Sequence, residues 1–111
     1  MQSTVKELTL NNGRKVELTL TFALLYKLRG KRKKDYDKYS EIVMNGVDEM
    51  LDYPRALYAA YLCGCIKNEI DEQLTEEEFY DLLPFDMDVV VNTYVELYNS
   101  GKKKPSGNPS A

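Results

Sequence analysis

Histidine and tryptophan are absent from this chain of 111 residues, and cysteine occurs only twice. Without histidine, no serine–histidine or cysteine–histidine pair can activate a nucleophile. Cys63 and Cys65 enclose a single residue, so a disulfide between them would be strained, and on a helix their side chains point to different faces. Two thiols also fall short of the four ligands of a structural zinc site. We therefore expect two buried thiols, no metal and no cofactor.

Long apolar runs and glycine-rich phosphate loops are also missing. A helix that crosses a bilayer needs about 20 predominantly apolar residues, and no stretch approaches that length. Residues 1–10, MQSTVKELTL, lack the apolar core of a secretory signal. No motif with a catalytic mechanism is recognisable. We expect an intracellular protein that has no membrane partner and is not an enzyme.

The charges are segregated along the chain. Residues 1–34 carry nine basic and two acidic side chains, a net charge of +7, whereas residues 35–100 carry three basic and sixteen acidic ones, a net charge of −13. The last eleven residues add +3, which gives the formal total of −3. Segments of opposite charge can attract further copies of the chain or a partner with the reverse pattern. The alternative is that these charges only solvate the surface.

The first part of the chain has the alternating pattern of a β-hairpin. Leu8 and Leu10 lie on a short first strand. In residues 14–22, RKVELTLTF, the apolar side chains at alternate positions are Val16, Leu18, Leu20 and Phe22. A two-residue Asn-Gly turn would put the two apolar rows on different faces. A three-residue loop with Gly13 in the left-handed conformation pairs Leu10 with Arg14 and Leu8 with Val16, and we expect this longer loop.

Two helices are predicted to follow, over residues 22–29 and 35–46. Thr21 can cap the start of the first helix and Gly30 its end. Gly46 is suited to end the second helix. The faces expected to be buried carry Phe22, Leu25 and Leu28 in the first helix and Tyr36, Tyr39 and Val43 in the second.

A central helix is predicted after Pro54, a residue that fits the first turn of a helix. Its wide apolar stripe consists of Leu57, Tyr58, Tyr61, Leu62, Cys65 and Ile66. The small residues beside this stripe, which let another backbone come close, are Ala56, Ala59, Ala60, Cys63 and Gly64. We expect the other elements to pack around this helix.

Residues 74–79, LTEEEF, form the clearest local signal. Thr75 can cap a helix while Glu78 reaches back to complete a capping box. The three glutamates also lie at the positive end of the helix dipole. Capping therefore explains these carboxylates better than a metal site or acid–base chemistry does.

A last helix is predicted within residues 86–101, with an apolar face made of Met87, Val90, Val91, Tyr94 and Tyr98. Residues 101–111 lack large apolar side chains and are expected to be disordered. A lone hairpin is barely stable, so it must pack on the helices. The sequence predicts one α+β domain over residues 1–100, in which an N-terminal β-hairpin packs on four to five helices.

Residues 29–34, RGKRKK, hold five basic side chains. They can be a grip on nucleic acid, or the exposed end of a helix, where cations interact favourably with the helix dipole. An isoelectric point near 5.0 and the acidic helices oppose binding to phosphates. We expect no nucleic-acid partner, and a small helical nucleic-acid-binding regulator that uses residues 29–34 is the alternative.

The order of these segments resembles the tail assembly chaperones of long-tailed bacteriophages. The resemblance spans roughly residues 5–100, and the stretches that carry it are the hairpin with its Asn/Gly turn, LTLTFALLYKLRG, DYPRALYAAYLCG, LTEEEFYDLL, the final amphipathic helix and the Lys/Gly/Pro tail. It implies a virion assembly protein of the host cytoplasm that binds the tape measure protein and assists tail tube polymerisation around it, and that is absent from the finished virion. The family has no catalytic residues.

Many members of this family are made in two lengths by a programmed frameshift, and the extension recruits the tail tube protein. The Lys102–Lys104 run can be encoded by a slippery stretch of that kind.

Coating a long partner calls for many copies, so we expect a homo-oligomer with head-to-tail contacts. The residues predicted to form these contacts are Lys31, Arg32, Lys33 and Lys34 on one copy, Glu76, Glu77 and Asp81 on its neighbour, and Tyr94 and Tyr98 as added apolar area.

Overall fold

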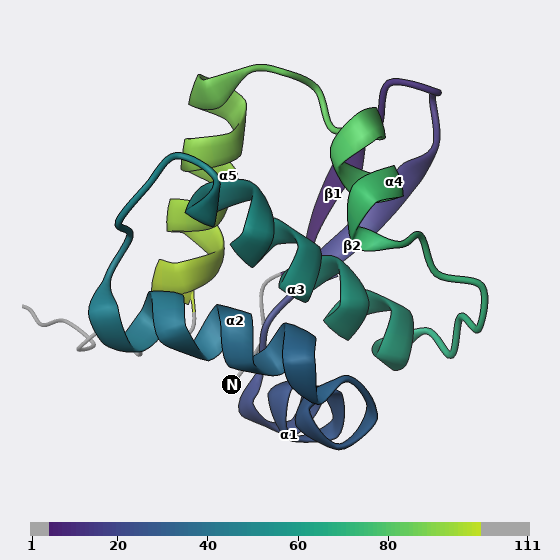
Figure 1. The fold of residues 1–111 in the computed structure, drawn as a ribbon. Coiled ribbons are helices and arrows are strands. Elements are labelled where there is room, and N and C mark those ends of the chain that lie inside the picture. The colour runs from purple at the N-terminus through teal and green to yellow at the C-terminus, as the bar shows by residue number, and fades with distance from the viewer. Residues whose placement is uncertain (1–4, 101–111) are drawn as a thin grey trace, which may run out of the picture.

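A computed structural model of the protein describes residues 5–100. An antiparallel hairpin is followed by five helices (Figure 1). The elements are β1 (Val5–Thr9), β2 (Lys15–Thr19), α1 (Phe22–Lys31), α2 (Lys33–Asn45), α3 (Asp52–Lys67), α4 (Glu76–Leu82) and α5 (Met87–Ser100). The predicted α+β class, with an N-terminal hairpin and mostly helical content, is confirmed. The predicted disordered tail, residues 101–111, lies outside the described residues.

The hairpin has the register and the loop that the alternation of apolar residues required. Leu8 pairs with Val16, as predicted. Gly13 has a φ of +86°, and its N–H donates to the carbonyl of Leu10 at 2.9 Å. The N–H of Leu10 donates to the carbonyl of Arg14 at 2.8 Å, which closes the three-residue loop. Both apolar rows therefore face the same side, and that side is buried.

Helix α3 runs through the middle of the molecule, as predicted (Figure 1). The hairpin packs on it, and the other four helices surround it. A Cβ atom at Gly64 would lie 2.3 Å from the carbonyl oxygen of Glu17 in β2. No side chain fits into so short a distance, so the glycine lets the strand and the helix approach each other.

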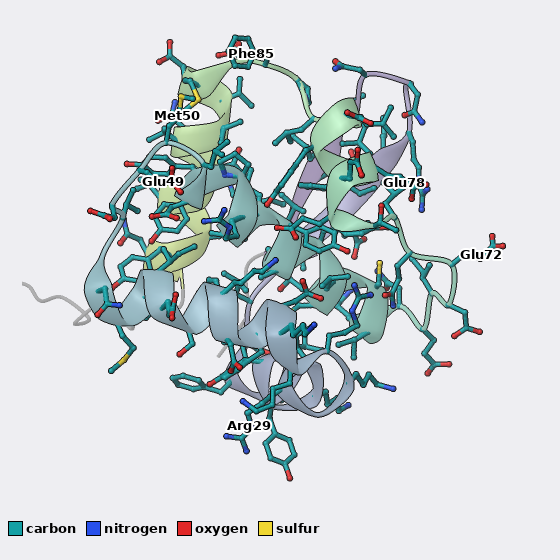
Figure 2. All side chains as sticks on the ribbon, in the orientation of Figure 1. Arg29, Glu49, Met50, Glu72, Glu78 and Phe85 are labelled. Atoms are coloured by element: carbon teal, nitrogen blue, oxygen red, sulfur yellow. The ribbon has the colours of Figure 1, made fainter. Side chains whose placement is uncertain are left out.

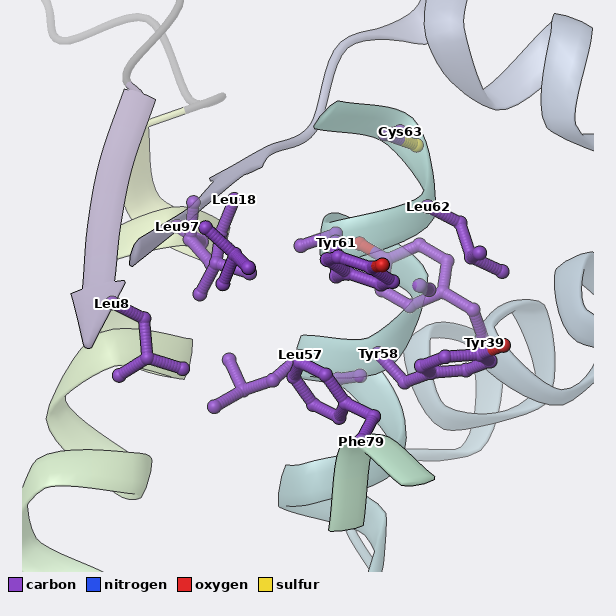
Figure 3. Packing of buried hydrophobic residues seen from close by; sticks show 14 of the residues in the cluster. Leu8, Leu18, Tyr39, Leu57, Tyr58, Tyr61, Leu62, Cys63, Phe79 and Leu97 are labelled. Carbon is purple, nitrogen blue, oxygen red and sulfur yellow. The ribbon is translucent and has the colours of Figure 1, made fainter. Parts of the chain in front are cut away.

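The core is built on α3 and receives side chains from all the surrounding elements (Figure 3). Among the buried residues around it are Leu8 and Leu18 of the hairpin, Leu28 of α1, Tyr39 of α2, Phe79 of α4 and Leu97 of α5. The ring of Phe79 stacks on Tyr61 with a centroid distance of 5.2 Å. The buried tyrosines of this core are Tyr39, Tyr58 and Tyr61, and other tyrosines, such as Tyr26, are exposed.

Several helix ends follow local capping rules. The hydroxyl of Thr21 accepts the N–H of Leu24 at 3.1 Å, and α2 ends at Gly46, which has a φ of +85°. Both halves of the capping box between Thr75 and Glu78 are present. The predicted end of α1 at Gly30 is wrong, because this glycine lies inside the helix, which continues to Lys31.

The buried face of α1 also differs from the prediction. Phe22 was expected in the core but is 93% exposed. Leu24, Leu25 and Leu28 face the core instead, and Phe22 lies about a third of a turn from the centre of their stripe.

In α2 and α5 the predicted apolar face differs from the structure only at its C-terminal position. In α2, Ile42 is buried and Val43 is exposed. In α5, Leu97 is buried and the adjacent Tyr98 is exposed. Helical spacing allows a step of either three or four residues, so tertiary contacts select one of the two.

Candidate functional site

The predicted basic segment contains one arginine that turns toward the interior. The guanidinium of Arg32 donates to Asp35 at 3.0 Å, to the side-chain oxygen of Gln73 at 2.9 Å and to the hydroxyl of Tyr58 at 3.3 Å. Arg32 therefore ties the junction of α1 and α2 to α3 and to the segment that precedes α4. We expected this side chain at an exposed helix end, but it is half-buried and structural.

The other cations of the segment are exposed, and two of them have partners. Lys33 pairs with Asp37 at 3.0 Å. The guanidinium of Arg29 lies over the ring of Tyr26 at 5.7 Å. Within residues 5–100, neither Lys31 nor Lys34 forms an ion pair, and both are exposed. Fewer side chains are thus available to phosphates than the sequence suggests.

The predicted acidic face on α4 is also partly used inside the molecule. Glu76 accepts a hydrogen bond from the hydroxyl of Tyr80 at 2.6 Å and pairs with Lys38 of α2 at 2.9 Å. Burial raises the pKa of Glu76, but these two partners together hold that pKa below its ordinary value. Glu77 and Asp81 are exposed and form no ion pair in the described part of the chain.

The two predicted tyrosines of α5 stack on each other, with a centroid distance of 5.9 Å. Tyr94 is half-buried and also meets the ring of Tyr53 edge-on at 5.4 Å. Tyr98 is more exposed than Tyr94. The predicted residues therefore lie in three places, on the α1–α2 junction, on α4 and on α5, rather than in one cluster.

The most exposed large apolar side chains were not predicted as site residues. Phe85, in the link between α4 and α5, is 92% exposed, nearly as much as Phe22 at the start of α1. Tyr26, one turn after Phe22, is exposed as well. In Figure 2, Phe85 and Arg29 lie at opposite ends of the molecule. The only sequence signal for Phe85 is its position directly after Pro84, outside the periodic segments.

A cavity of about 800 Å³ opens between α2, the link of residues 46–51 and the start of α3. Its lining residues are Lys38, Glu41, Ile42, Asn45, Gly46, Asp48, Glu49, Asp52 and Arg55. The lining is charged, with both signs present, and the cavity was not foreseen from the sequence.

Asp52 holds the link in place above this cavity. Its carboxylate accepts the backbone N–H groups of Asp48 at 2.8 Å and Glu49 at 3.2 Å, and the guanidinium of Arg55 at 2.9 Å. The hydrogen bond from the N–H of Asp48 is the largest cause of a lowered pKa at Asp52, and it outweighs the effect of burial. The carboxylate is thus ionised and structural at neutral pH.

The thiols offer no reactive site. Cys63 and Cys65 are both buried and unpaired, as predicted. Burial raises the pKa of Cys63 to about 12, so a nucleophilic thiolate is not available at neutral pH. No group of three or more metal-ligating side chains occurs among the described residues.

Comparison of the chain with protein-family models, with curated protein sequences and with solved structures found no match. None of the helices in the described range combines the length and the apolar character that crossing a membrane requires.

Proposed function

We propose that this protein is a tail assembly chaperone of a long-tailed bacteriophage. In the host cytoplasm it binds the tape measure protein, keeps it soluble and assists polymerisation of the tail tube around it, without becoming part of the virion. A frameshift-extended form recruits the tail tube protein. The order of the segments supports this proposal, because the resemblance depends on a hairpin followed by helices, and the chain has that order.

The observation that carries the proposal is the exposure of Phe22 and Phe85, at 93% and 92%. Burying one phenylalanine side chain contributes about 1.5–3 kcal/mol of favourable free energy. A partner that covers both rings would therefore gain this free energy twice on binding. Aromatic side chains are enriched where proteins contact each other, so each exposed ring offers contact area to a partner. The two rings lie on different elements, so one apolar helical client can contact a single copy in more than one place.

Co-expression tests this function. The reading frame that follows this gene would be expressed with and without the protein, and the soluble fraction of its product measured. We expect that product to be long, helical and apolar, to aggregate alone, and to copurify with the wild-type protein. The double variant Phe22→Ser, Phe85→Ser should lose this effect.

A matched control is Val95→Ser, which removes an exposed apolar side chain from α5, a helix that carries neither ring, and should retain the effect. A client that stays equally soluble without the protein would refute the proposal.

We propose in addition that copies associate head to tail. Lys31 and Lys34 of one copy face Glu77 and Asp81 of the next, because these are the members of the predicted contact that are exposed and form no ion pair within residues 5–100. Arg32 and Glu76 instead form contacts within their own copy, Arg32 with Gln73 and Glu76 with Lys38.

A further inference from the structure

We propose that the α2–α3 link (residues 46–51), the last turn of α2 and the cavity beside them form the docking site for one amphipathic helix that carries Lys or Arg next to its apolar residues. The chemistry of this partner is inferred from the site alone. That the helix belongs to the tape measure protein rests on the proposed function.

The apolar half of the site comes from a single short stretch of chain. The exposed large apolar side chains are Val43 and Met44 in the last turn of α2 and Val47, Met50 and Leu51 in the α2–α3 link; they lie outside the cavity lining itself. Met44 is 79% exposed and Met50 is 54% exposed. Methionine is unbranched and polarisable, so it adapts to partners of different shape and is common at surfaces that bind varied helices. This stretch therefore suits a client whose apolar residues vary along its length.

The charged half of the site is negative. The carboxylates that line the cavity belong to Glu41, Asp48, Glu49 and Asp52. The two cations in the lining are already paired, Lys38 with Glu76 at 2.9 Å and Arg55 with Asp52 at 2.9 Å. Among the described residues, Glu41 and Asp48 form no ion pair. Their carboxylates are free to attract a basic side chain of the partner.

The site is held in shape before any partner arrives. Asp52 accepts two backbone N–H groups of the α2–α3 link, and Gly46 turns the chain at its positive φ. Figure 2 shows Glu49 and Met50 together on this link, far from the basic end of the molecule marked by Arg29. A fixed backbone with adaptable methionines lowers the entropic cost of binding.

A second copy fits this site less well than a separate helix does. The basic helix of another copy is α1, whose Leu24, Leu25 and Leu28 pack on its own core. It therefore offers only Phe22 and Tyr26 as large exposed apolar side chains. A separate helix can present a complete apolar face.

The test uses two synthetic helical peptides labelled with fluorescein, which share a leucine face and carry either lysines or glutamates on the other face. Fluorescence anisotropy with the full chain should show binding of the lysine peptide and much weaker binding of the glutamate peptide. Met44→Ser with Met50→Ser should weaken binding of the lysine peptide about tenfold or more. Glu41→Gln with Asp48→Asn should weaken it as well and reduce its salt dependence.

The matched control is Ile70→Ser, which removes an exposed apolar side chain between α3 and α4 and should leave the affinity unchanged. Circular dichroism checks that each variant keeps its fold. The proposal is overturned if the wild-type protein does not bind the lysine peptide, if both peptides bind equally, or if the methionine variant binds like wild type. It is also overturned if light scattering shows that the same methionines mediate association of copies in the absence of peptide.

The co-expression assay separates this site from the proposed function. If the methionine variant keeps the client soluble as well as the wild-type protein does, the site is wrong and the chaperone function stands. If the wild-type protein binds the lysine peptide at this site but never retains the client, the chaperone function is wrong and the site stands.

Discussion

At the scale of single residues, Gly64 sets the distance between α3 and the hairpin. A methyl group there would meet the backbone oxygen of Glu17 at 2.3 Å, and a backbone atom cannot move aside as a flexible side chain can. We predict that Gly64→Ala lowers the free energy of unfolding by about 1–3 kcal/mol. Urea denaturation, followed by circular dichroism, measures the change.

Gly30 provides the internal comparison for this prediction. It lies inside α1, and a Cβ atom there would have no neighbour within 4 Å. Gly30→Ala should therefore raise the free energy of unfolding by about 0.5–1 kcal/mol through helix propensity. Equal effects of the same sign at both glycines would contradict the role assigned to Gly64.

Asp52 makes stability depend on pH. Because its pKa in the folded protein is lowered, the ionised carboxylate stabilises the fold above the unfolded pKa of about 3.9, and this contribution is lost as the pH falls through the folded pKa. Asp52→Asn should therefore be less stable than wild type at pH 7, with a difference that shrinks in acid below about pH 4. Urea midpoints at several pH values test this, and a difference that does not vary with pH would contradict it.

At the scale of elements, two tyrosines of α3 fasten the segment that leads into α4. The hydroxyl of Tyr58 donates to the carbonyl of Leu74 at 2.9 Å, and the N–H of Leu74 donates to the hydroxyl of Tyr61 at 2.8 Å. Both backbone groups of one residue are thus satisfied by neighbouring turns of one helix. This use of the hydroxyl explains why tyrosine, rather than phenylalanine, occupies these core positions.

We predict that Tyr61→Phe lowers the free energy of unfolding by about 1–3 kcal/mol, because the N–H of Leu74 is left without its partner. Tyr26→Phe, at an exposed position, should change it little. Thermal unfolding compares the two variants. A loss at Tyr26 as large as that at Tyr61 would show that the hydrogen bond to Leu74 is not the cause.

Local rules predicted the elements well and their tertiary roles less well. The register of the hairpin, Thr21 and the capping box of α4 depend on residues a few positions apart, so the sequence contains the full signal. Arg32 was placed at the surface because its partner Gln73 is 41 residues away. No local pattern reveals a hydrogen bond across that separation.

The sequence predicted the charged residues of the candidate contact surfaces but not most of their exposed apolar residues. Charge runs showed the exposed Lys31 and Glu77, but they could not show which of their neighbours are paired inside the chain. Phe22 was placed in the core because helical spacing alone does not fix the rotation of a helix. The apolar side chains of the α2–α3 link, Val47, Met50 and Leu51, were missed because they lie between two predicted helices.

At the scale of the whole molecule, the net charge of the first 34 residues opposes that of the remainder of the domain. Some of this charge is neutralised inside one copy, by pairs that join the two segments, such as Lys6 with Glu96 and Lys33 with Asp37. The unpaired remainder is the charge available for the proposed head-to-tail contacts between copies, a type of contact that closes into rings or continues as spirals.

We predict association at low salt that weakens as salt is added, because each exposed pair contributes only about 0–1 kcal/mol and is screened. Light scattering at several salt concentrations measures the mass. Replacing Lys31 and Lys34 with glutamine should reduce it, and Lys27→Gln is a control outside the proposed contact. A strict monomer at high protein concentration and low salt would contradict the prediction, and an oligomer insensitive to salt would assign the contact to apolar side chains.

The close contact between β2 and α3 also governs the order in which the chain can fold during synthesis. The side chain of Lys67 in α3 donates a hydrogen bond to the carboxylate of Glu17 in β2, 50 residues earlier in the chain. The hairpin is translated before α3, and until α3 has been translated the hairpin has no surface to pack on. An isolated hairpin is barely stable in water. The hairpin therefore gains the surface that stabilises it only after the central helix α3 has left the ribosome.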